Sequence, residues 1–320
     1  MSKQISYKDI SEQAGVSIST ISRYYNNGYV STKTRKKIED VVREHQYYPN
    51  HGARLIRGRD QSIFIIMPEW TQNLYFSIVN GIVAACKKNN RRVTITFTGK
   101  SSEEYIETVR YILSWRPTSL VIFNPEYDSK LFDFLKTVED VSIVVYEHQV
   151  NGLSWIKVDE TAAFYDVTKA LISTVSHERS SILFLEDAKL SLTQKEDRYA
   201  GFMRACQEKG YSFQKYEVAF NNSKNVSDFI KLTKEKNISN IVCSSHESYI
   251  ALSVQVTNNL RLTDIGYQSV YDRISSYRSK IFIDYPSIGI EIEKMLLLHS
   301  VEKKPQTKSV KVKILTPEQK

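Results

Sequence analysis

A short run of hydrogen-bonding side chains near the amino terminus carries the clearest chemistry in this chain of 320 residues. Hydroxyl, amide and guanidinium groups stand there with one apolar side chain among them: Ser17, Ile18, Ser19, Thr20, Ser22, Arg23, Asn26 and Tyr29. Such groups can hydrogen-bond to phosphates and to base edges in double-stranded DNA, whose major groove displays a distinct pattern for each base pair. This run therefore suits the reading of a DNA sequence.

Two short helices and a glycine turn are expected to position this run. Residues 8–13 have a helical pattern, Gly15 suits a left-handed turn, and Ser17 suits the N-cap of a second helix that ends near Tyr24. This arrangement presents the second helix to the major groove, although a generic helical hairpin would look the same. Ser19, Thr20, Ser22 and Arg23 are expected to face outward. The residues expected to close one small core over three helices are Ile10, Ala14, Val16, Ile21, Tyr24, Ile38 and Val41.

Positive charge concentrates in the same region. Residues 1–60 hold eleven Lys and Arg against six Asp and Glu, so they carry +5 of the net charge of +8. Basic clusters are often only solvated helix faces. Here they flank the candidate recognition helix, where contacts to DNA phosphates would be needed.

Three linked motifs resemble the LacI/GalR family of bacterial repressors. They stand as DISEQAGVSISTISRYYN, VSTKTRKKI and YYPNHGAR, and Ser11 occupies a position where the family usually has alanine. The resemblance implies a helix-turn-helix DNA-binding domain over 1–48, a hinge helix or linker over 49–60, and an effector-binding and dimerisation core over 61–320. It also implies that Ser17, Ile18, Ser19 and Arg23 read base edges, with Arg23 placed to pair with a guanine.

The hinge follows from the same resemblance. Residues 50–57 resemble a helix that folds on operator DNA and pushes an apolar side chain into the minor groove. The wedge would be Ile56, with Leu55 beside it, Ala53 close to the groove floor and Asn50 at the start of the helix. Gly52 should weaken the free helix. An ordinary interdomain linker is the alternative.

After residue 60 the pattern alternates between strand and helix, which predicts parallel, doubly wound sheets. The first series has strands 62–68, 92–98, 119–123 and 141–146 and helices 76–89, 103–114 and 129–138. The second has helix 161–175, strand 181–185, helix 197–209, strand 214–219, helix 226–236, strand 240–243 and helix 247–257. The predicted fold is an all-α helix-turn-helix head followed by an α/β core of two lobes.

The resemblance covers this core as well, because family regulators carry a core similar to periplasmic sugar-binding proteins. In that fold the chain crosses between the lobes three times, so helix 287–299 and strand 309–315 should return to the first lobe. Lobe one would hold about 61–158 and 286–320, and lobe two about 159–285. A ligand would bind in the cleft between them, at the carboxyl ends of the strands.

Effector contacts are implied by position within family motifs. EDRYAGF places Arg198 at the opening of a long helix, where the guanidinium of the family's arginine donates paired hydrogen bonds to sugar hydroxyls. The alternative is a surface pair with Asp197 or Glu196. QNLYF makes Asn73, Tyr75 and Phe76 candidates for polar and stacking contacts with a ring. The aromatic residues could equally belong to the core of the next helix.

Other cleft positions depart from the family pattern. His246 stands where Asn-Asp is usual, and Gln268 stands where an aspartate usually accepts sugar hydroxyls. Gln268 could still hydrogen-bond, and Glu147 could supply a carboxylate from the other lobe. His246 is either a hydrogen-bonding residue of the cleft or an ordinary loop histidine, and the loop interpretation is favoured.

Several classes of function find no support in the residues. Cys86, Cys206 and Cys243 are odd in number and scattered, which suits a reducing cytoplasm rather than disulfides. We find no glycine-rich phosphate loop, nucleophile elbow or metal-spaced His and Cys set, so we expect no catalytic residues, no metal and no cofactor. No apolar run reaches the length of a membrane span and no signal-like segment opens the chain. A cytoplasmic protein that is not an enzyme is expected.

The resulting hypothesis is a transcriptional repressor of a carbohydrate-utilisation operon. It would bind a pseudo-palindromic operator as a homodimer and respond to a sugar or related metabolite. The alternative is a regulator whose core docks a protein corepressor, such as a phosphocarrier protein, without a sugar effector. A dimer rather than a tetramer is expected, because no heptad repeat follows strand 309–315. The surplus apolar surface for dimer contacts is expected on helix 76–89, at Ile78, Val79, Ile82 and Val83.

Overall fold

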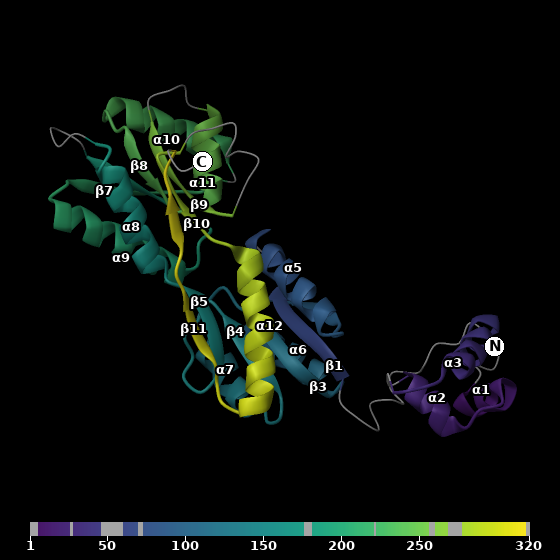
Figure 1. The fold of residues 1–320 in the computed structure, drawn as a ribbon. Helices are drawn as coiled ribbons and strands as arrows, with labels where there is room; N and C mark the ends of the chain where they lie inside the picture. The colour runs from purple at the N-terminus through teal and green to yellow at the C-terminus, as the bar shows by residue number, and fades with distance from the viewer. Residues whose placement is uncertain are drawn as a thin grey trace. The chain divides into compact units, whose positions relative to one another are not determined.

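The computed structural model describes residues 6–25, 28–45, 60–69, 73–175, 181–220, 222–255, 260–267 and 277–317. The chain divides into two compact units, Met1–Gly58 and Arg59–Lys320 (Figure 1). Each unit buries apolar side chains of its own, so each has its own hydrophobic core.

The amino-terminal unit contains α1 (Tyr7–Ala14), α2 (Ile18–Tyr25) and α3 (Thr32–Glu44). Ser6 and Asp9 form a capping box at the start of α1, and Gly15 ends the helix with a φ of 62°. The hydroxyl of Ser17 accepts a hydrogen bond from the backbone N–H of Thr20, at 3.2 Å. These local signals confirm the predicted helices and turn. The small core is confirmed as well, with Ile10, Ala14, Ile21 and Ile38 buried and Val16, Tyr24 and Val41 packed against them.

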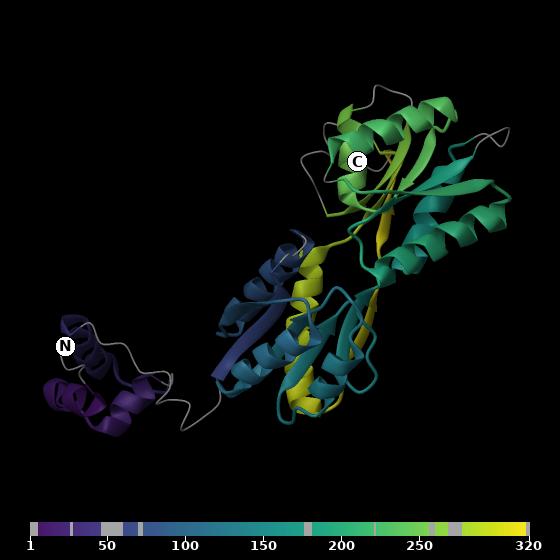
Figure 2. The same cartoon turned by 180° about the vertical axis from the view of Figure 1, so that it is seen from behind.

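The first lobe is a parallel sheet in the order β2-β1-β3-β4-β5-β11. Its strands are β1 (Asp60–Pro68), β2 (Val93–Thr98), β3 (Pro117–Phe123), β4 (Ser142–Tyr146), β5 (Ser154–Val158) and β11 (Thr307–Val310). Alternation along β1 sends Ile63, Ile65 and Met67 to one face and Phe64 and Ile66 to the other. The first face is covered by α5 (Asn73–Lys88) and α12 (Tyr285–Glu302), and the second by α6 (Ser102–Leu113) and α7 (Ser129–Lys136) (Figures 1 and 2).

The second lobe repeats this order as β7-β6-β8-β9-β10-β12. Its strands are β6 (Ile182–Asp187), β7 (Phe213–Val218), β8 (Asn240–Cys243), β9 (Arg261–Gly266), β10 (Ser279–Phe282) and β12 (Lys313–Leu315), the last of which is antiparallel. Helices α8 (Glu160–Ile172) and α9 (Leu192–Lys209) pack on one face, and α10 (Ser223–Glu235) and α11 (His246–Gln255) on the other. The two-lobed doubly wound core is therefore confirmed.

Three details of the predicted elements are wrong. The single strand 309–315 is two strands, because β11 pairs with β5 in the first lobe and β12 pairs with β10 in the second. Helix α9 begins at Leu192 rather than at 197, since Ser191 and Gln194 form a capping box there. Strands β5, β9 and β10 were missed. They are short and interrupted by polar residues. Each of them lies inside a sheet, where it pairs with a neighbouring strand on either side.

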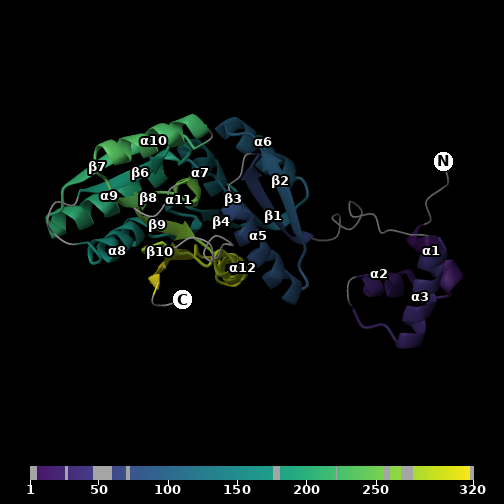
Figure 3. The same ribbon diagram turned by 90° about the horizontal axis from the view of Figure 1, so that it is seen from above.

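Two helix pairs approach so closely that only glycine fits at their crossings. A Cβ at Gly289 would lie 2.0 Å from the carbonyl oxygen of Ile78, and one at Gly81 would lie 2.0 Å from that of Pro286. This crossing holds α12 beside α5, as Figures 1 and 3 show. A Cβ at Gly201 on α9 would similarly lie 2.1 Å from the carbonyl oxygen of Thr161 on α8. The glycine of the EDRYAGF motif therefore serves helix packing.

Candidate functional sites

The candidate recognition face lies on α2 and the turn before it. Ser17, Ser19 and Arg23 are exposed, and Ile18 is 47 % exposed. The hydroxyl of Ser17 lies 2.8 Å from that of Ser19 and 2.8 Å from that of Thr20. Thr20 and Ser22 are half-buried, so the outward-facing prediction applies fully only to Ser19 and Arg23. Further along, Tyr29 is 89 % exposed.

Helix α3 supports α2 from behind. Its Ile38 is fully buried in the small core, and the guanidinium of Arg35 lies over the ring of Tyr24, 5.4 Å from its centroid. The hydroxyl of Tyr24 donates to Glu39 at 3.4 Å. Because these contacts hold the inner face of α2, its outer face stays available. The predicted DNA contacts Asn26, Asn50, Ala53, Leu55 and Ile56 lie outside the described residues, as does the predicted effector contact Gln268.

A small cavity lies between the two lobes at the carboxyl ends of β4 and β5. Its volume is about 20 Å³. The charged and polar side chains that line it come from both lobes: Glu147, His148 and Lys157 from the first, and Glu160, Ser191, Thr193, Gln194 and Asp197 from the second. A cavity of this size holds about one water molecule, so a sugar requires the lobes to part. The position agrees with the rule that ligands of such sheets bind at the carboxyl ends of the strands.

The beginning of α9 makes the hydrogen bonds that join the lobes around this cavity. The Gln194 side-chain amide donates to Glu147 at 3.0 Å, and the Lys157 ammonium lies 2.6 Å from the Asp197 carboxylate. The backbone N–H of Leu192 donates to the Glu126 carboxylate at 3.3 Å. A helix N-terminus favours a carboxylate, because its N–H groups are otherwise unsatisfied. Lobe closure thus depends on polar contacts that a ligand could replace.

Glu147 is the central acceptor of the cleft. Its carboxylate accepts from the Tyr75 hydroxyl at 2.7 Å as well as from Gln194. Burial raises the pKa of Glu147 to about 7, partly offset by the hydrogen bond from Tyr75. Its backbone is left-handed, with a φ of 76°. Such a conformation costs a non-glycine residue about 1 to 3 kcal/mol, and it tends to occur at ligand sites.

Arg198 is buried, with 5 % of its surface exposed. Its Nε and Nη2 donate to the two carboxylate oxygens of Glu160 at 2.8 and 2.6 Å, and its Nη1 donates to the carbonyl oxygen of Ser244 at 2.6 Å. The alternative of a surface pair with Asp197 or Glu196 is therefore wrong. Arg198 lies inside α9 rather than at its opening, and Glu160 is the member of the pair that lines the cavity.

His246 begins α11, so the loop interpretation is wrong. Its Nδ1 lies 2.8 Å from the carboxylate of Asp264, whose other oxygen lies 2.9 Å from the ammonium of Lys280. Asp264 and Lys280 are almost fully buried and occupy paired positions on β9 and β10. His246 sits at the carboxyl end of β8 but is not among the residues that line the cavity between the lobes.

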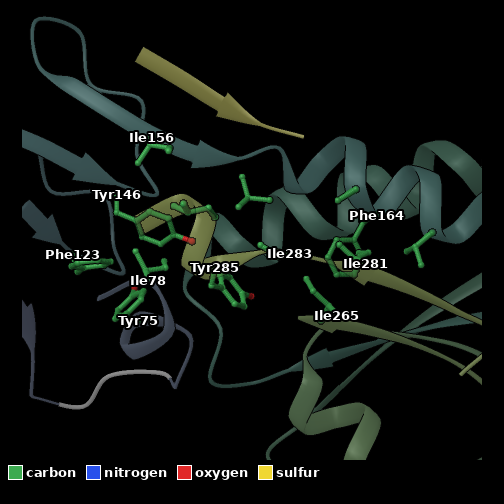
Figure 4. Packing of buried hydrophobic residues seen from close by; sticks show 14 of the residues in the cluster. Tyr75, Ile78, Phe123, Tyr146, Ile156, Phe164, Ile265, Ile281, Ile283 and Tyr285 are labelled. Atoms are coloured by element: carbon green, nitrogen blue, oxygen red, sulfur yellow. The ribbon is translucent and has the colours of Figure 1, made fainter. Parts of the chain in front are cut away.

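The two aromatic residues of the QNLYF motif lie in different environments, one buried and one exposed. Tyr75 is 1 % exposed and packs against Phe123 and Tyr146, with ring centroids 4.9 and 6.0 Å away (Figure 4). It therefore belongs to the core and reaches the cleft only through its hydroxyl. Phe76 is 43 % exposed on α5, and Asn73 is the first residue of that helix.

Sequence reasoning missed several residues that line the cavity, namely His148, Lys157, Glu160 and Gln194. Recognition of β5 would have placed Lys157 near the carboxyl end of a strand. His148 packs close to the same edge, and its Nε2 lies 2.7 Å from the carbonyl oxygen of Asn124. A carbonyl can only accept, so Nε2 carries the proton. Burial lowers the pKa of His148, which favours the neutral ring.

In the described part of the chain, no His, Cys, Asp and Glu side chains form a group of three or more that could hold a metal ion. None of its helices combines the length and the apolar character that a membrane span requires. Cys86, Cys206 and Cys243 are buried free thiols.

Comparisons with known proteins match both units. Residues 6–50 match the bacterial regulatory proteins of the lacI family, and residues 60–274 match the periplasmic binding proteins and sugar binding domain of the LacI family. The transcriptional regulator RegA of Clostridium saccharobutylicum is 24% identical over 294 residues, 88% of this chain and 86% of its own length. The ribose operon repressor of Bacillus subtilis is 24% identical over 233 residues, 71% of this chain and 67% of its own.

Among solved structures, the lac repressor dimer bound to operator and the anti-inducer ONPF has the same fold. Its TM-score is 0.78 at 17% sequence identity, with 98% of each chain covered. The sugar-binding match alone spans more than half of the chain, and the matched relatives are transcriptional regulators rather than enzymes. In agreement with its three amino-terminal motifs, the chain belongs to the LacI family of bacterial transcriptional regulators.

Proposed function

We propose that this protein represses a carbohydrate-utilisation operon by binding a pseudo-palindromic operator as a homodimer, and that a sugar or related metabolite in the cleft changes its affinity for DNA. The observation that carries the proposal is the exposed face of α2 in a helix-turn-helix unit of a LacI-family chain. Relatives support the sugar control, since one of them is a ribose operon repressor.

In this proposal Ser17, Ile18, Ser19 and Arg23 contact base edges in the major groove. Their exposure supports the assignment, and Ile18 adds an apolar contact suited to a thymine methyl group. Arg23 is the residue for a bidentate contact to guanine, because its planar fork matches two acceptors on that base. Thr20, Ser22 and Tyr29 extend the same surface.

Arg23→Ala tests the DNA-reading assignment. An operator is first selected from random duplexes with the full-length protein. The variant is expected to bind it with an affinity lower by about 1 to 3 kcal/mol and to lose preference at one base pair per half-site. The affinity of the variant for random DNA should fall less, because random DNA offers only phosphate contacts. Arg43→Ala, which removes an exposed arginine from α3, is the control. Equal losses on operator and random DNA for Arg23→Ala would show that Arg23 touches only phosphate.

The cleft supplies the proposed switch. Glu147 and Lys157 approach it from the first lobe, and Glu160, Gln194 and Asp197 from the second. A ligand that bonds to both walls stabilises one arrangement of the lobes over another, and only this difference in affinity can shift DNA binding. Arg198 acts as a positioning residue for Glu160, since its guanidinium is engaged by that carboxylate. Thermal unfolding of the full-length protein with sugar probes tests whether the cleft binds a ligand of this class.

The proposed dimer surface joins α5, α12 and the edge strand β2. Of the helix residues expected to supply it, Ile78, Val79 and Ile82 are buried in the core, because α12 covers them; Val83 is 44 % exposed. Ile95 and Phe97 on β2 pair with Ile65 and Met67 and so face the same side as α5. Exposed apolar residues on α12 extend this surface, namely Ile290, Leu297 and Val301. An isologous contact would bury them.

Phe97→Glu tests this surface. We expect a dimer for the parent protein at micromolar concentration in sedimentation velocity. The variant should shift towards monomer, because the substitution places two like charges in a self-complementary apolar contact. Val254→Glu, at an exposed position of α11 in the second lobe, should leave the dimer intact. A parent protein that sediments as a monomer and still binds its operator tightly would contradict the dimer.

A further inference from the structure

The charges around the cavity do not balance. Three carboxylates gather there, from Glu147, Glu160 and Asp197. Two cations accompany them, and each is already committed: Arg198 to Glu160 and Lys157 to Asp197. The carboxylate of Glu147 is left with two neutral donors, the hydroxyl of Tyr75 and the amide of Gln194. When Glu147 is ionised, the carboxylates described at the cavity therefore outnumber these cations by one.

An anionic ligand does not suit this lining. A phosphate or carboxylate near Glu147 would add like charge where burial weakens the screening by solvent. His148 offers no positive charge, because burial lowers its pKa. The N-terminus of α9, which could otherwise bind an anion, already accommodates the carboxylate of Glu126. The described lining thus opposes a phosphorylated sugar.

A cationic group on the ligand would resolve the imbalance. A partly buried carboxylate without a counter-ion is costly, and an ammonium in hydrogen-bond contact offsets this cost by a charge-assisted bond. The pKa of about 7 for Glu147 agrees, because burial opposes its charged form. The titratable and charged groups around Glu147 are Tyr75 on α5, Tyr105 on α6, Tyr146 on β4, His148 after β4, Lys157 on β5, Glu160 on α8, Asp197 and Arg198 on α9, and Tyr285 on α12.

We propose that the effector carries an ammonium group beside its hydroxyls, as an amino sugar does, and that Glu147 binds this ammonium. This inference rests on the proposed sugar control of the cleft. It names the chemical class of the ligand and makes Glu147 the residue that selects it. The hydroxyls of the ligand would then hydrogen-bond to the remaining donors and acceptors of the two walls, among them Gln194 and Glu160.

The experiment uses pairs of probes that differ in one group. Thermal unfolding of the full-length protein at pH 7 is followed with glucosamine against glucose, galactosamine against galactose, and mannosamine against mannose, with glucose 6-phosphate as the anionic probe. A ligand that binds only the folded state raises Tm by mass action. At least one amine should bind about 10- to 100-fold more tightly than its parent sugar, the range expected of a hydrogen bond to a charged group.

The variant Glu147→Gln keeps the size of the side chain and removes its charge. It should bring the amine to within about twofold of the parent sugar, because a neutral amide cannot form the charge-assisted bond. Glu235→Gln, at an exposed position of α10, should preserve the preference. If parent sugars or glucose 6-phosphate bind as well as the amines, the amine inference is overturned and sugar control stands. If none of the probes raises Tm, sugar control by these classes and the inference are both rejected.

Discussion

Arg198→Ala is expected to lower the free energy of unfolding of the core by about 3 to 5 kcal/mol, because it leaves the Glu160 carboxylate buried without its partner. The pair is nearly inaccessible to solvent, with 6 % of the Arg198 side chain and 12 % of the Glu160 side chain exposed. The carbonyl of Ser244 also loses its donor. Urea denaturation followed by circular dichroism measures the change.

Two further variants isolate the cause. Arg204→Ala removes an exposed arginine from the same helix, where the guanidinium lies 3.9 Å from the centroid of the Tyr165 ring. It should cost no more than about 1 kcal/mol. In a double-mutant cycle, Arg198→Ala with Glu160→Gln should be less destabilised than Arg198→Ala alone, because the stranded charge is gone. If Arg198→Ala lowers the free energy of unfolding no more than Arg204→Ala does, the guanidinium of Arg198 does not bind Glu160 in solution.

Gly289→Ala is expected to lower the free energy of unfolding by about 3 kcal/mol through overpacking at the crossing of α5 and α12. The added methyl group would lie 2.0 Å from the carbonyl oxygen of Ile78 and 2.7 Å from the backbone nitrogen of Ile82, so the helices must separate. Backbone atoms cannot move aside as a flexible side chain can. Thermal and urea unfolding measure the loss of stability, and sedimentation tests whether dimerisation is weakened as well.

Helix propensity alone predicts the opposite effect of Gly289→Ala on stability. Alanine is favoured over glycine inside a helix by about 1 kcal/mol, so Gly289→Ala should stabilise the protein if the crossing is loose. Ser300→Ala, at an exposed position of the same helix, measures the effect of propensity without a packing change. A gain in stability for both variants would contradict the close crossing.

The local signals of the sequence were sufficient where a few neighbouring residues decide the structure. Ser17 and Gly15 mark the turn of the helix-turn-helix because an N-cap and a left-handed C-cap act within a few residues. The alternation of apolar strands with helices likewise predicted the doubly wound core. Strands β9 and β10 were missed because each contains a charged residue, Asp264 and Lys280, and a window along the chain cannot show that they neutralise each other across the sheet.

The candidate site was predicted in outline. Arg198 and Tyr75 were placed near the cleft from their positions in motifs, and Glu147 from its position after strand 141–146. The structure does bring the hydroxyl of Tyr75 to Glu147. It assigns Arg198 to Glu160, 38 residues earlier in the chain, which no local pattern could reveal. Gln194 was missed because α9 was expected to begin later, and its amide reaches Glu147 only when the lobes meet.

By itself, the sequence determined the family, the helix-turn-helix head and the alternation of most strands with helices, because these depend on short motifs and on the periodicity of apolar residues. Only the tertiary structure decided how the charges of the cleft are shared. Salt bridges join groups that are distant in the chain, and their strength depends on burial and on separations of a few ångströms. Arg198 and Lys157 consequently pair with Glu160 and Asp197, while the carboxyl group of Glu147 accepts hydrogen bonds from two neutral donors, Tyr75 and Gln194.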